Sequence, residues 1–175
     1  MKKTRTKTQS LKAKAKKIRM LLLDVDGVLT DGRIILDNQG NEIKAFHVRD
    51  GHGIKLAQRA GIIIGIITGR KAEVVNVRAR ELGIDEVHQG VHEKIKVFEA
   101  ICTKYRLQDD EVAFIGDDIV DAAILQRVGL AVVVADADPS VRPFADLITE
   151  ANGGRGAVRE AINFLLQSQG RPPAP

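Results

Sequence analysis

The apolar positions of this 175-residue chain fall into short runs that alternate with amphipathic stretches from residue 20 to about residue 166. Short consecutive apolar runs are typical of strands buried on both faces, whereas longer stretches with an apolar residue every three or four positions are typical of helices. The predicted strands cover residues 20–25, 62–67, 112–115, 130–134 and, briefly, 146–149. The predicted helices cover residues 53–60, 71–82, 94–105, 118–128 and 157–167.

Buried strands that alternate with helices imply a parallel sheet covered by helices on both faces. We therefore predict an α/β fold with a doubly wound parallel sheet, a Rossmann-like core. One segment interrupts the alternation, because residues 33–37 and 42–48 are strand-like and flank the turn sequence Asn38-Gln39-Gly40-Asn41. That pattern predicts a small β-hairpin insertion at 33–48, between the first strand and the first helix.

The charge is unevenly distributed. The net charge is +4, but the first 19 residues contain nine Lys or Arg and no acidic residue, so the remainder is net acidic. We expect a basic, disordered leader at 1–18, one domain at 19–168 and a flexible tail at 169–175. The leader has no aromatic residue to stack on bases, which favours a solvated extension over a nucleic-acid-binding arm.

Composition also limits where the protein works. No apolar run approaches the roughly 20 residues that cross a bilayer, so no membrane partner is expected. Cys102 is the only cysteine and cannot form an intrachain disulfide. A single thiol fits a reducing, cytoplasmic compartment.

Polar side chains follow several predicted strands at the point where each strand ends. Asp24 and Asp26 follow the first strand, Thr68 follows the second, and Asp117 follows the strand at 112–115. Lys94 begins a predicted helix. Because ligands of open α/β sheets bind beyond the carboxyl ends of the strands, we expect these groups on one rim.

These residue types suit phosphoryl transfer. Asp24 and Asp26 are two apart and point to the same side of an extended chain, and with Asp117 they offer the oxygen ligands that Mg²⁺ prefers. Mg²⁺ screens the repulsion between a carboxylate and a phosphate, so Asp24 can attack phosphorus and form an aspartyl-phosphate. Asp26 can protonate the leaving oxygen and later activate water, while Thr68 and Lys94 hold the transferring oxygens. Alone, Asp117 or Thr68 would be interpreted as a helix cap or turn residue.

The chain resembles the haloacid dehalogenase superfamily of phosphatases. The four superfamily motifs appear in order as Asp24-Val-Asp26-Gly-Val-Leu-Thr-Asp31-Gly, Ile67-Thr68-Gly-Arg70, Lys94 and Gly116-Asp117-Asp118-Ile-Val-Asp121. The resemblance implies that Asp24 is nucleophile and metal ligand and that Asp26 binds the metal through its backbone carbonyl. It also implies that Asp117 completes the protein ligands, with Asp118 and Asp121 supporting the site from behind.

The resemblance narrows to the 3-deoxy-D-manno-octulosonate 8-phosphate phosphatases, which supply an eight-carbon sugar acid for bacterial lipopolysaccharide. It rests on the segments at 44–51, 66–72 and 153–160 and covers about residues 18–168. In that family the substrate contacts match the catalytic Asp26 and Lys94 together with His47, Val48, Arg49, Asp50, Gly51, Lys55, Arg70 and Arg78. His47 departs from the Asn of the family pattern. Arg side chains suit a substrate that carries both a carboxylate and a phosphate.

The chain has no room for the separate cap domain that many superfamily members place over the rim. An uncapped site excludes water poorly, and a neighbouring subunit is an economical remedy. The resemblance implies a tetramer in which hairpins associate and C-terminal segments reach adjacent sites, with Arg155 as a contact from the neighbouring subunit.

Three alternatives remain at this stage. A phosphatase for a nine-carbon keto-deoxy sugar acid would use the same machinery. A signalling receiver module also combines Asp, Thr and Lys on an α/β fold, but Asp26 argues for turnover because it can hydrolyse the intermediate. A nucleic-acid-binding protein has only the basic leader in its favour.

Overall fold

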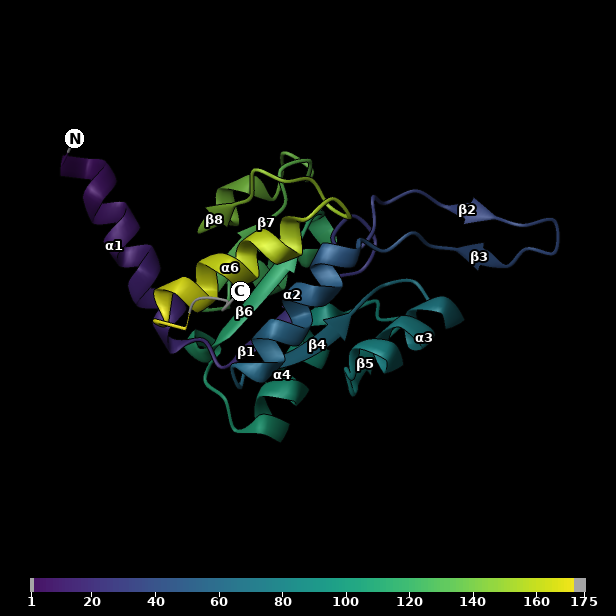
Figure 1. Ribbon diagram of the computed structural model, residues 1–175, viewed down its shortest axis with the longest axis horizontal. Helices are drawn as coiled ribbons and strands as arrows, with labels where there is room; N and C mark the ends of the chain where they lie inside the picture. Colours follow the sequence, from purple (N-terminus) through teal and green to yellow (C-terminus); the bar gives the residue numbers. More distant parts are fainter. Residues whose placement is uncertain (1, 172–175) are drawn as a thin grey trace.

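The central sheet is built from short strands rich in Val, Ile and Leu, and most of their side chains are buried. The structure, a computed structural model, describes residues 2–171, with side chains from residue 9 onward (Figure 1). Within that part of the chain the main sheet has six parallel strands in the order β5-β4-β1-β6-β7-β8. These strands are β1 (Met20–Leu23), β4 (Ile63–Ile67), β5 (Glu86–His88), β6 (Val112–Gly116), β7 (Leu130–Val133) and β8 (Leu147–Ile148).

Helices cover both faces of the sheet, which confirms the doubly wound α/β prediction. On one face α2 lies beside α6 and α3, and α1 meets the end of α6; α4 and α5 pack together on the other face. The α-helices are α1 (Lys2–Lys17), α2 (Val48–Arg59), α3 (Glu73–Leu82), α4 (Lys94–Tyr105), α5 (Ala122–Leu125) and α6 (Ala157–Ser168). Short 3-10 turns are η1 (Asp109–Glu111), η2 (Ile119–Asp121) and η3 (Arg142–Phe144). None of the described helices is both long and apolar enough to cross a membrane.

A hairpin interrupts the alternation where it was predicted. Strands β2 (Ile35–Leu36) and β3 (Glu42–Ile43) pair antiparallel, and the hairpin projects from the edge at which the sheet strands end (Figure 1). Four of its large apolar side chains are exposed: Ile34, Ile35, Leu36 and Ile43. This hairpin is the only insertion into the sheet-and-helix alternation within the described residues.

The first of the predicted helices, α2, begins earlier than predicted. The sequence prediction started it at residue 53, but α2 begins at Val48. Gly51 and Gly53, which weaken a helix, are buried inside it where neighbouring side chains approach closely. A Cβ at Gly51 would lie 2.2 Å from Nη2 of Arg78, and one at Gly53 would lie 2.9 Å from Cδ of Arg159.

Two further elements differ from the prediction. Strand β5 was missed, because its residues Glu86, Val87 and His88 form no apolar run. The helix predicted at 118–128 is instead the turn η2 followed by the single-turn α5. The buried carboxylate of Asp121, which accepts backbone N–H groups from Asp117 and Asp118, accompanies this tight turn.

Within the leader predicted at 1–18, Lys2–Lys17 forms helix α1, and Ile18 is buried directly after it. Ala15 is buried too, and the side-chain amide of Gln169 donates to the carbonyls of Ala15 and Ile18 at 3.0 and 2.7 Å. In the tail predicted at 169–175, Arg171 donates to the Ala60 carbonyl. Residue 1 and residues 172–175 lie outside the described part.

Candidate active site

Three neighbouring strands bring the predicted groups to one edge. Asp24 follows β1, Thr68 follows β4 and Asp117 follows β6, and β1 lies between the other two strands. Lys94 is the first residue of α4 and reaches the same edge. Asp24, Thr68 and Lys94 are all buried.

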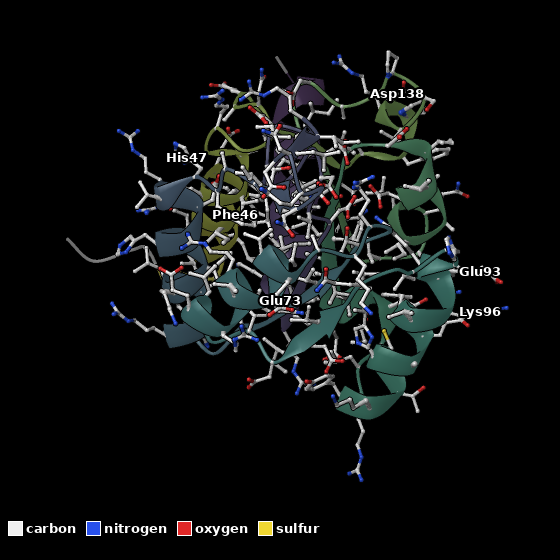
Figure 2. The ribbon with its side chains drawn as sticks, turned by 90° about the vertical axis from the view of Figure 1, so that its right-hand side faces the viewer. Phe46, His47, Glu73, Glu93, Lys96 and Asp138 are labelled. Atoms are coloured by element: carbon white, nitrogen blue, oxygen red, sulfur yellow. The ribbon has the colours of Figure 1, made fainter. Side chains whose placement is uncertain are left out.

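Figure 2 looks onto this edge of the molecule. His47, Glu73 and Glu93 stand at or beside the first residues of α2, α3 and α4, and Asp138 follows β7.

A buried ammonium group links the cluster. The Lys94 Nζ lies 2.9 Å from Oδ2 of Asp24 and 2.7 Å from Oδ1 of Asp121, and its side chain is 2% exposed. Burial alone would lower the pKa of Lys94, but the two carboxylates outweigh it and raise the pKa above its ordinary value. Lys94 therefore stays positively charged at neutral pH, as a group that holds phosphate oxygens requires.

Asp121 supports the site from behind. One of its oxygens accepts from Lys94, and the other accepts the backbone N–H of Asp117 at 3.0 Å. A Cβ at Gly116 would lie 2.6 Å from the Asp121 carboxylate, so this close approach needs glycine. Asp118 caps the following turn by accepting the N–H of Ile119 at 2.6 Å.

The carboxylates of Asp24 and Asp117 are crowded. Burial and the nearby charge of Asp121 raise the pKa of Asp24 to about 6, against the opposing effect of Lys94. Burial and the charges of Asp24, Asp121 and Asp118 raise the pKa of Asp117 to about 8. Several acidic groups held this close are stable in ionised form only beside compensating positive charge.

The cluster fits a hard cation. Ligand oxygens of Asp24, Asp117 and Asp121 lie within 4.8 Å of one another. Oδ1 of Asp117 is buried and has no hydrogen-bond partner among the described residues. Gly27, at φ +87°, leaves room for this side chain, because a Cβ there would lie 2.0 Å from Asp117 Oδ2. Carboxylate oxygens with spare capacity suit Mg²⁺.

The predicted metal set differs from this cluster in one member. Asp26 was expected to bind through its backbone carbonyl, and its side chain is not part of the cluster. Instead its Oδ1 pairs with the ammonium of Lys44. Lys44 also lies 2.7 Å from Glu42 Oε1, and Arg70 lies 3.2 Å from Glu42 Oε2.

The segment predicted to bind substrate lies at the start of α2. Val48 and Arg49 are exposed and His47 is half-buried. Asp50, in contrast, is buried, and both of its oxygens accept backbone N–H groups that begin α6, from Gly156 at 3.2 Å and Arg159 at 2.7 Å. Its carboxylate therefore fixes α2 to the positive end of α6.

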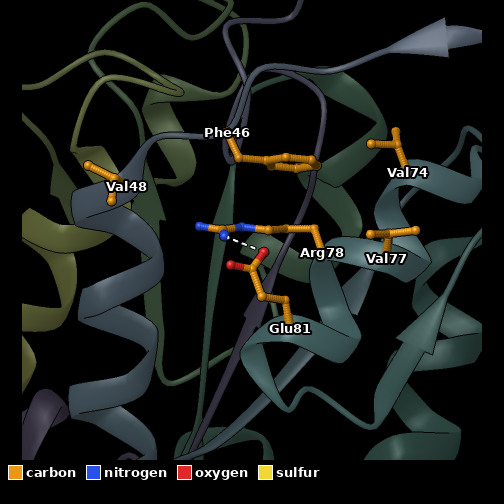
Figure 3. A pocket seen from close by; sticks show the side chains of 6 residues that line it. All are labelled: Phe46, Val48, Val74, Val77, Arg78 and Glu81. Atoms are coloured by element: carbon orange, nitrogen blue, oxygen red, sulfur yellow. Dashed lines mark hydrogen bonds and ion pairs between the residues drawn. The ribbon is translucent and has the colours of Figure 1, made fainter.

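Arg78 lies beside this segment in a pocket of about 300 Å³ (Figure 3). Its Nη1 pairs with Glu81 at 2.7 Å, and its guanidinium carbon lies 5.8 Å from the centroid of the Phe46 ring. The Nε of Arg78 is buried without a partner among the residues described. The remaining lining residues are Val48, Val74 and Val77.

Two predicted contacts lie elsewhere in this chain. A Cβ built at Gly83, which ends α3, would lie 3.3 Å from the Lys55 Nζ, so Lys55 reaches the far end of α3. Arg155 is exposed and pairs with Asp31 of its own chain at 3.3 Å. Neither side chain is in contact with the Asp24 cluster.

Sequence reasoning missed Lys44 and Glu42. Both looked like polar positions of a solvent-exposed hairpin strand, and only their spacing of two residues indicated a shared side. The burial of Lys44 depends on the packing of the hairpin base against the loop after β1, which is a long-range contact that no local pattern encodes.

Together these groups can transfer a phosphoryl group. A buried carboxylate, a buried ammonium, a neighbouring carboxylic acid and a site for a divalent cation are the components of nucleophilic attack on a phosphate ester.

The comparisons with known proteins agree with this chemistry. Residues 83–162 match a family described as haloacid dehalogenase-like hydrolase. The chain is 49% identical over 159 residues to the 3-deoxy-D-manno-octulosonate 8-phosphate phosphatase of Escherichia coli K12, covering 91% of this chain and 85% of the relative.

Solved structures of related phosphatases are also similar to this chain. The phosphatase of the same name from Yersinia pestis superposes with a TM-score of 0.91 at 43% identity, covering 93% of this chain and 88% of that chain. The Moraxella catarrhalis phosphatase, solved with magnesium ion, phosphate ion and KDO, gives a TM-score of 0.91 at 38% identity, covering 93% of both chains.

Proposed function

The chain belongs to the 3-deoxy-D-manno-octulosonate 8-phosphate phosphatases among the haloacid dehalogenase-like hydrolases, and we propose that it hydrolyses 3-deoxy-D-manno-octulosonate 8-phosphate with Mg²⁺. The products are the free sugar acid, which enters lipopolysaccharide biosynthesis, and phosphate. The observation that carries the proposal is the buried Asp24–Lys94–Asp121 cluster with Asp117 at the carboxyl edge of the sheet.

Asp24 is the nucleophile. Asp24, Asp117 and the backbone carbonyl of Asp26 would hold Mg²⁺, which would supply the positive charge that lets a carboxylate approach an anionic phosphate. A carboxylate oxygen of Asp24 bonds to phosphorus as the bond from phosphorus to the sugar oxygen breaks. The buried Lys94, which already holds Asp24, binds the oxygens of the transferring group with the Thr68 hydroxyl.

Asp26 is the acid and base. It gives its proton to the leaving sugar oxygen, and then accepts a proton from the water that attacks phosphorus. That attack releases phosphate and regenerates the Asp24 carboxylate. The spacing of Asp24 and Asp26 supports this division, since the two flank one residue at the end of β1.

Substrate recognition is assigned to the start of α2 and the arginines nearby. Val48 lines the pocket that holds Arg78, and Gly51 lies close to the Arg78 guanidinium. His47 and Arg49 flank Val48 in the sequence, and Arg70 follows β4. Arg70 and Arg78 are suited to the carboxylate of a sugar acid. Asp50 contributes by fixing this segment to α6. Lys55 is assigned to the substrate-binding set as well.

We also propose a cytoplasmic homotetramer. The exposed Ile34, Ile35, Leu36 and Ile43 on the hairpin support association, because apolar patches of this kind favour burial against another protein surface. A neighbouring copy of the chain would cover the uncapped rim, and its Arg155 would reach the site after leaving Asp31. Sedimentation equilibrium that gives only monomer would contradict the assembly.

The test is phosphate release from a panel of phosphorylated sugars and sugar acids, with Mg²⁺ and with EDTA. We expect preference for 3-deoxy-D-manno-octulosonate 8-phosphate over a nine-carbon keto-deoxy sugar acid 9-phosphate, and background rates with EDTA. Asp24→Asn is expected to lower kcat by at least about 10³-fold, because it removes the nucleophile.

Asp110→Asn is the matched control, because this exposed carboxylate pairs with Lys17 at the opposite edge of the sheet, where β1 and β6 begin. It should retain full turnover. Preference for the nine-carbon substrate would replace the assigned substrate and keep the chemistry, whereas full activity of Asp24→Asn would overturn the mechanism.

A further inference from the structure

Lys44 is buried although it belongs to an exposed hairpin. It follows β3, and its neighbours Ile43 and Ala45 are exposed, but the Lys44 side chain is only 1% exposed. A lysine loses hydration when it is buried, so it is retained only where acceptors compensate the charge.

Two carboxylates compensate it. The Lys44 Nζ pairs with Oδ1 of Asp26 and lies 2.7 Å from Oε1 of Glu42, whose side chain is 11% exposed. The second oxygen of Glu42 pairs with Arg70 at 3.2 Å. Glu42 is thus held on both sides and fixes the position of the Lys44 ammonium.

The two oxygens of Asp26 are left in different environments. Oδ1 accepts from Lys44, whereas Oδ2 is buried and has no hydrogen-bond partner among the described residues. Lys44 therefore holds the Asp26 side chain through one oxygen only. The free oxygen is the one available to exchange a proton with a reacting group.

We propose that Lys44 is a positioning residue for Asp26, and that Glu42 holds Lys44 in place. Lys44 fixes Oδ1, so that Oδ2 faces the oxygen that leaves phosphorus. As the bond between phosphorus and that oxygen breaks, the proton on Oδ2 passes to the leaving oxygen, and the Asp26 carboxylate that forms is paired with the Lys44 ammonium, which keeps all of its protons. This assignment rests on the proposed function, in which Asp26 is the acid.

The test separates proton donation from substrate recognition. Phenyl phosphate and 4-nitrophenyl phosphate are similar in size and lack a carboxylate, but phenolate needs a proton to leave far more than nitrophenolate does. We expect Lys44→Met to lower kcat/KM for phenyl phosphate at least about tenfold more than for 4-nitrophenyl phosphate, because general acid catalysis contributes roughly 10²–10⁴-fold.

Two further variants keep the test decisive. Lys44→Gln retains a hydrogen-bond donor and should show a smaller difference between the two substrates, even if Lys44→Met folds poorly. Lys96→Met removes an exposed lysine that pairs with Glu93 at 2.7 Å, and should change neither rate.

Equal losses on both substrates, or no loss, would overturn the positioning role while the wild-type protein remained an active phosphatase. Failure of the proposed function would look different, because the Asp24→Asn variant would then release phosphate as fast as the wild-type protein.

Discussion

At the residue scale, buried charges in this chain occur with partners of opposite charge or with several hydrogen-bond donors. Lys94 and Lys44 lie at the carboxyl edge of the sheet, each between two carboxylates. Glu86, away from that edge, is surrounded by three donors: His88, Lys104 and Tyr105, each at 2.6 Å. The first two sets suit catalysis, and the third stabilises the fold.

Glu86 gives a pH-dependent prediction. Burial alone would raise its pKa, but the contacts with Lys104, Tyr105 and His88 outweigh burial and lower the pKa from 4.5 to about 2. Above pH 4.5 the full stabilisation is present; as the pH falls toward 2, the unfolded chain binds a proton that the folded chain does not, and the stabilisation is lost. Glu86→Gln should lower the free energy of unfolding by up to about 3 kcal/mol at neutral pH.

The measurement is urea unfolding of both proteins across this pH range. The difference between wild type and Glu86→Gln should shrink as the pH falls from 4.5 toward 2. Glu93→Gln, at an exposed carboxylate, is the control and should show little difference at any pH. A Glu86→Gln difference that did not depend on pH would contradict the assigned pKa.

Local sequence was sufficient for residues whose position follows from a strand end. Asp24, Thr68 and Asp117 each stand directly after an apolar run, so their convergence could be predicted. Lys44 could not be found in this way, because its contact with Asp26 joins residues 18 positions apart through the fold of the hairpin. The contacts of Asp50 with Gly156 and Arg159 at the start of α6 could not be found either, because they join residues 106 and 109 positions apart.

At the element scale, periodicity predicted helices and strands that carry strong apolar patterns, and failed where polar residues are buried by tertiary contacts. Helix α4 was predicted with its observed bounds and α6 to within one residue. Strand β5 lacks an apolar run, and α2 contains two glycines that accommodate Arg78 and Arg159. Helix α1 was missed because most of its residues are polar or basic and few of its positions are buried, so its sequence has no clear apolar pattern.

The end of α1 is expected to contribute to stability. Ile18 is 3% exposed, and the Gln169 amide donates to its carbonyl. Ile18→Ala should lower the free energy of unfolding by about 2–4 kcal/mol, because it leaves a cavity in the core. Lys12→Ala, at an exposed position of α1, should change it by no more than about 0.5 kcal/mol. Urea unfolding measures both, and equal effects would mean that α1 is not packed as described.

At the scale of the whole molecule, the sheet separates stability from chemistry. Core side chains and the Glu86 contacts stabilise the packed sheet and helices, while Asp24, Lys94 and Asp117 lie at the carboxyl edge. The hairpin projects from that same edge (Figure 1). The hairpin reaches beyond that edge and supplies Lys44 and Glu42 to the site. Movement of the hairpin, for instance on contact with another copy of the chain, would therefore act directly on Asp26.

The most direct test of the central claim is to find the phosphate on the enzyme. The protein is mixed with ³²P-labelled 3-deoxy-D-manno-octulosonate 8-phosphate and Mg²⁺, quenched in acid during turnover, digested and mapped. The account predicts label on the peptide that contains Asp24, released by hydroxylamine as expected for an acyl phosphate, and none in Asp24→Asn. Label on a different residue, or turnover without any labelled enzyme, would contradict it.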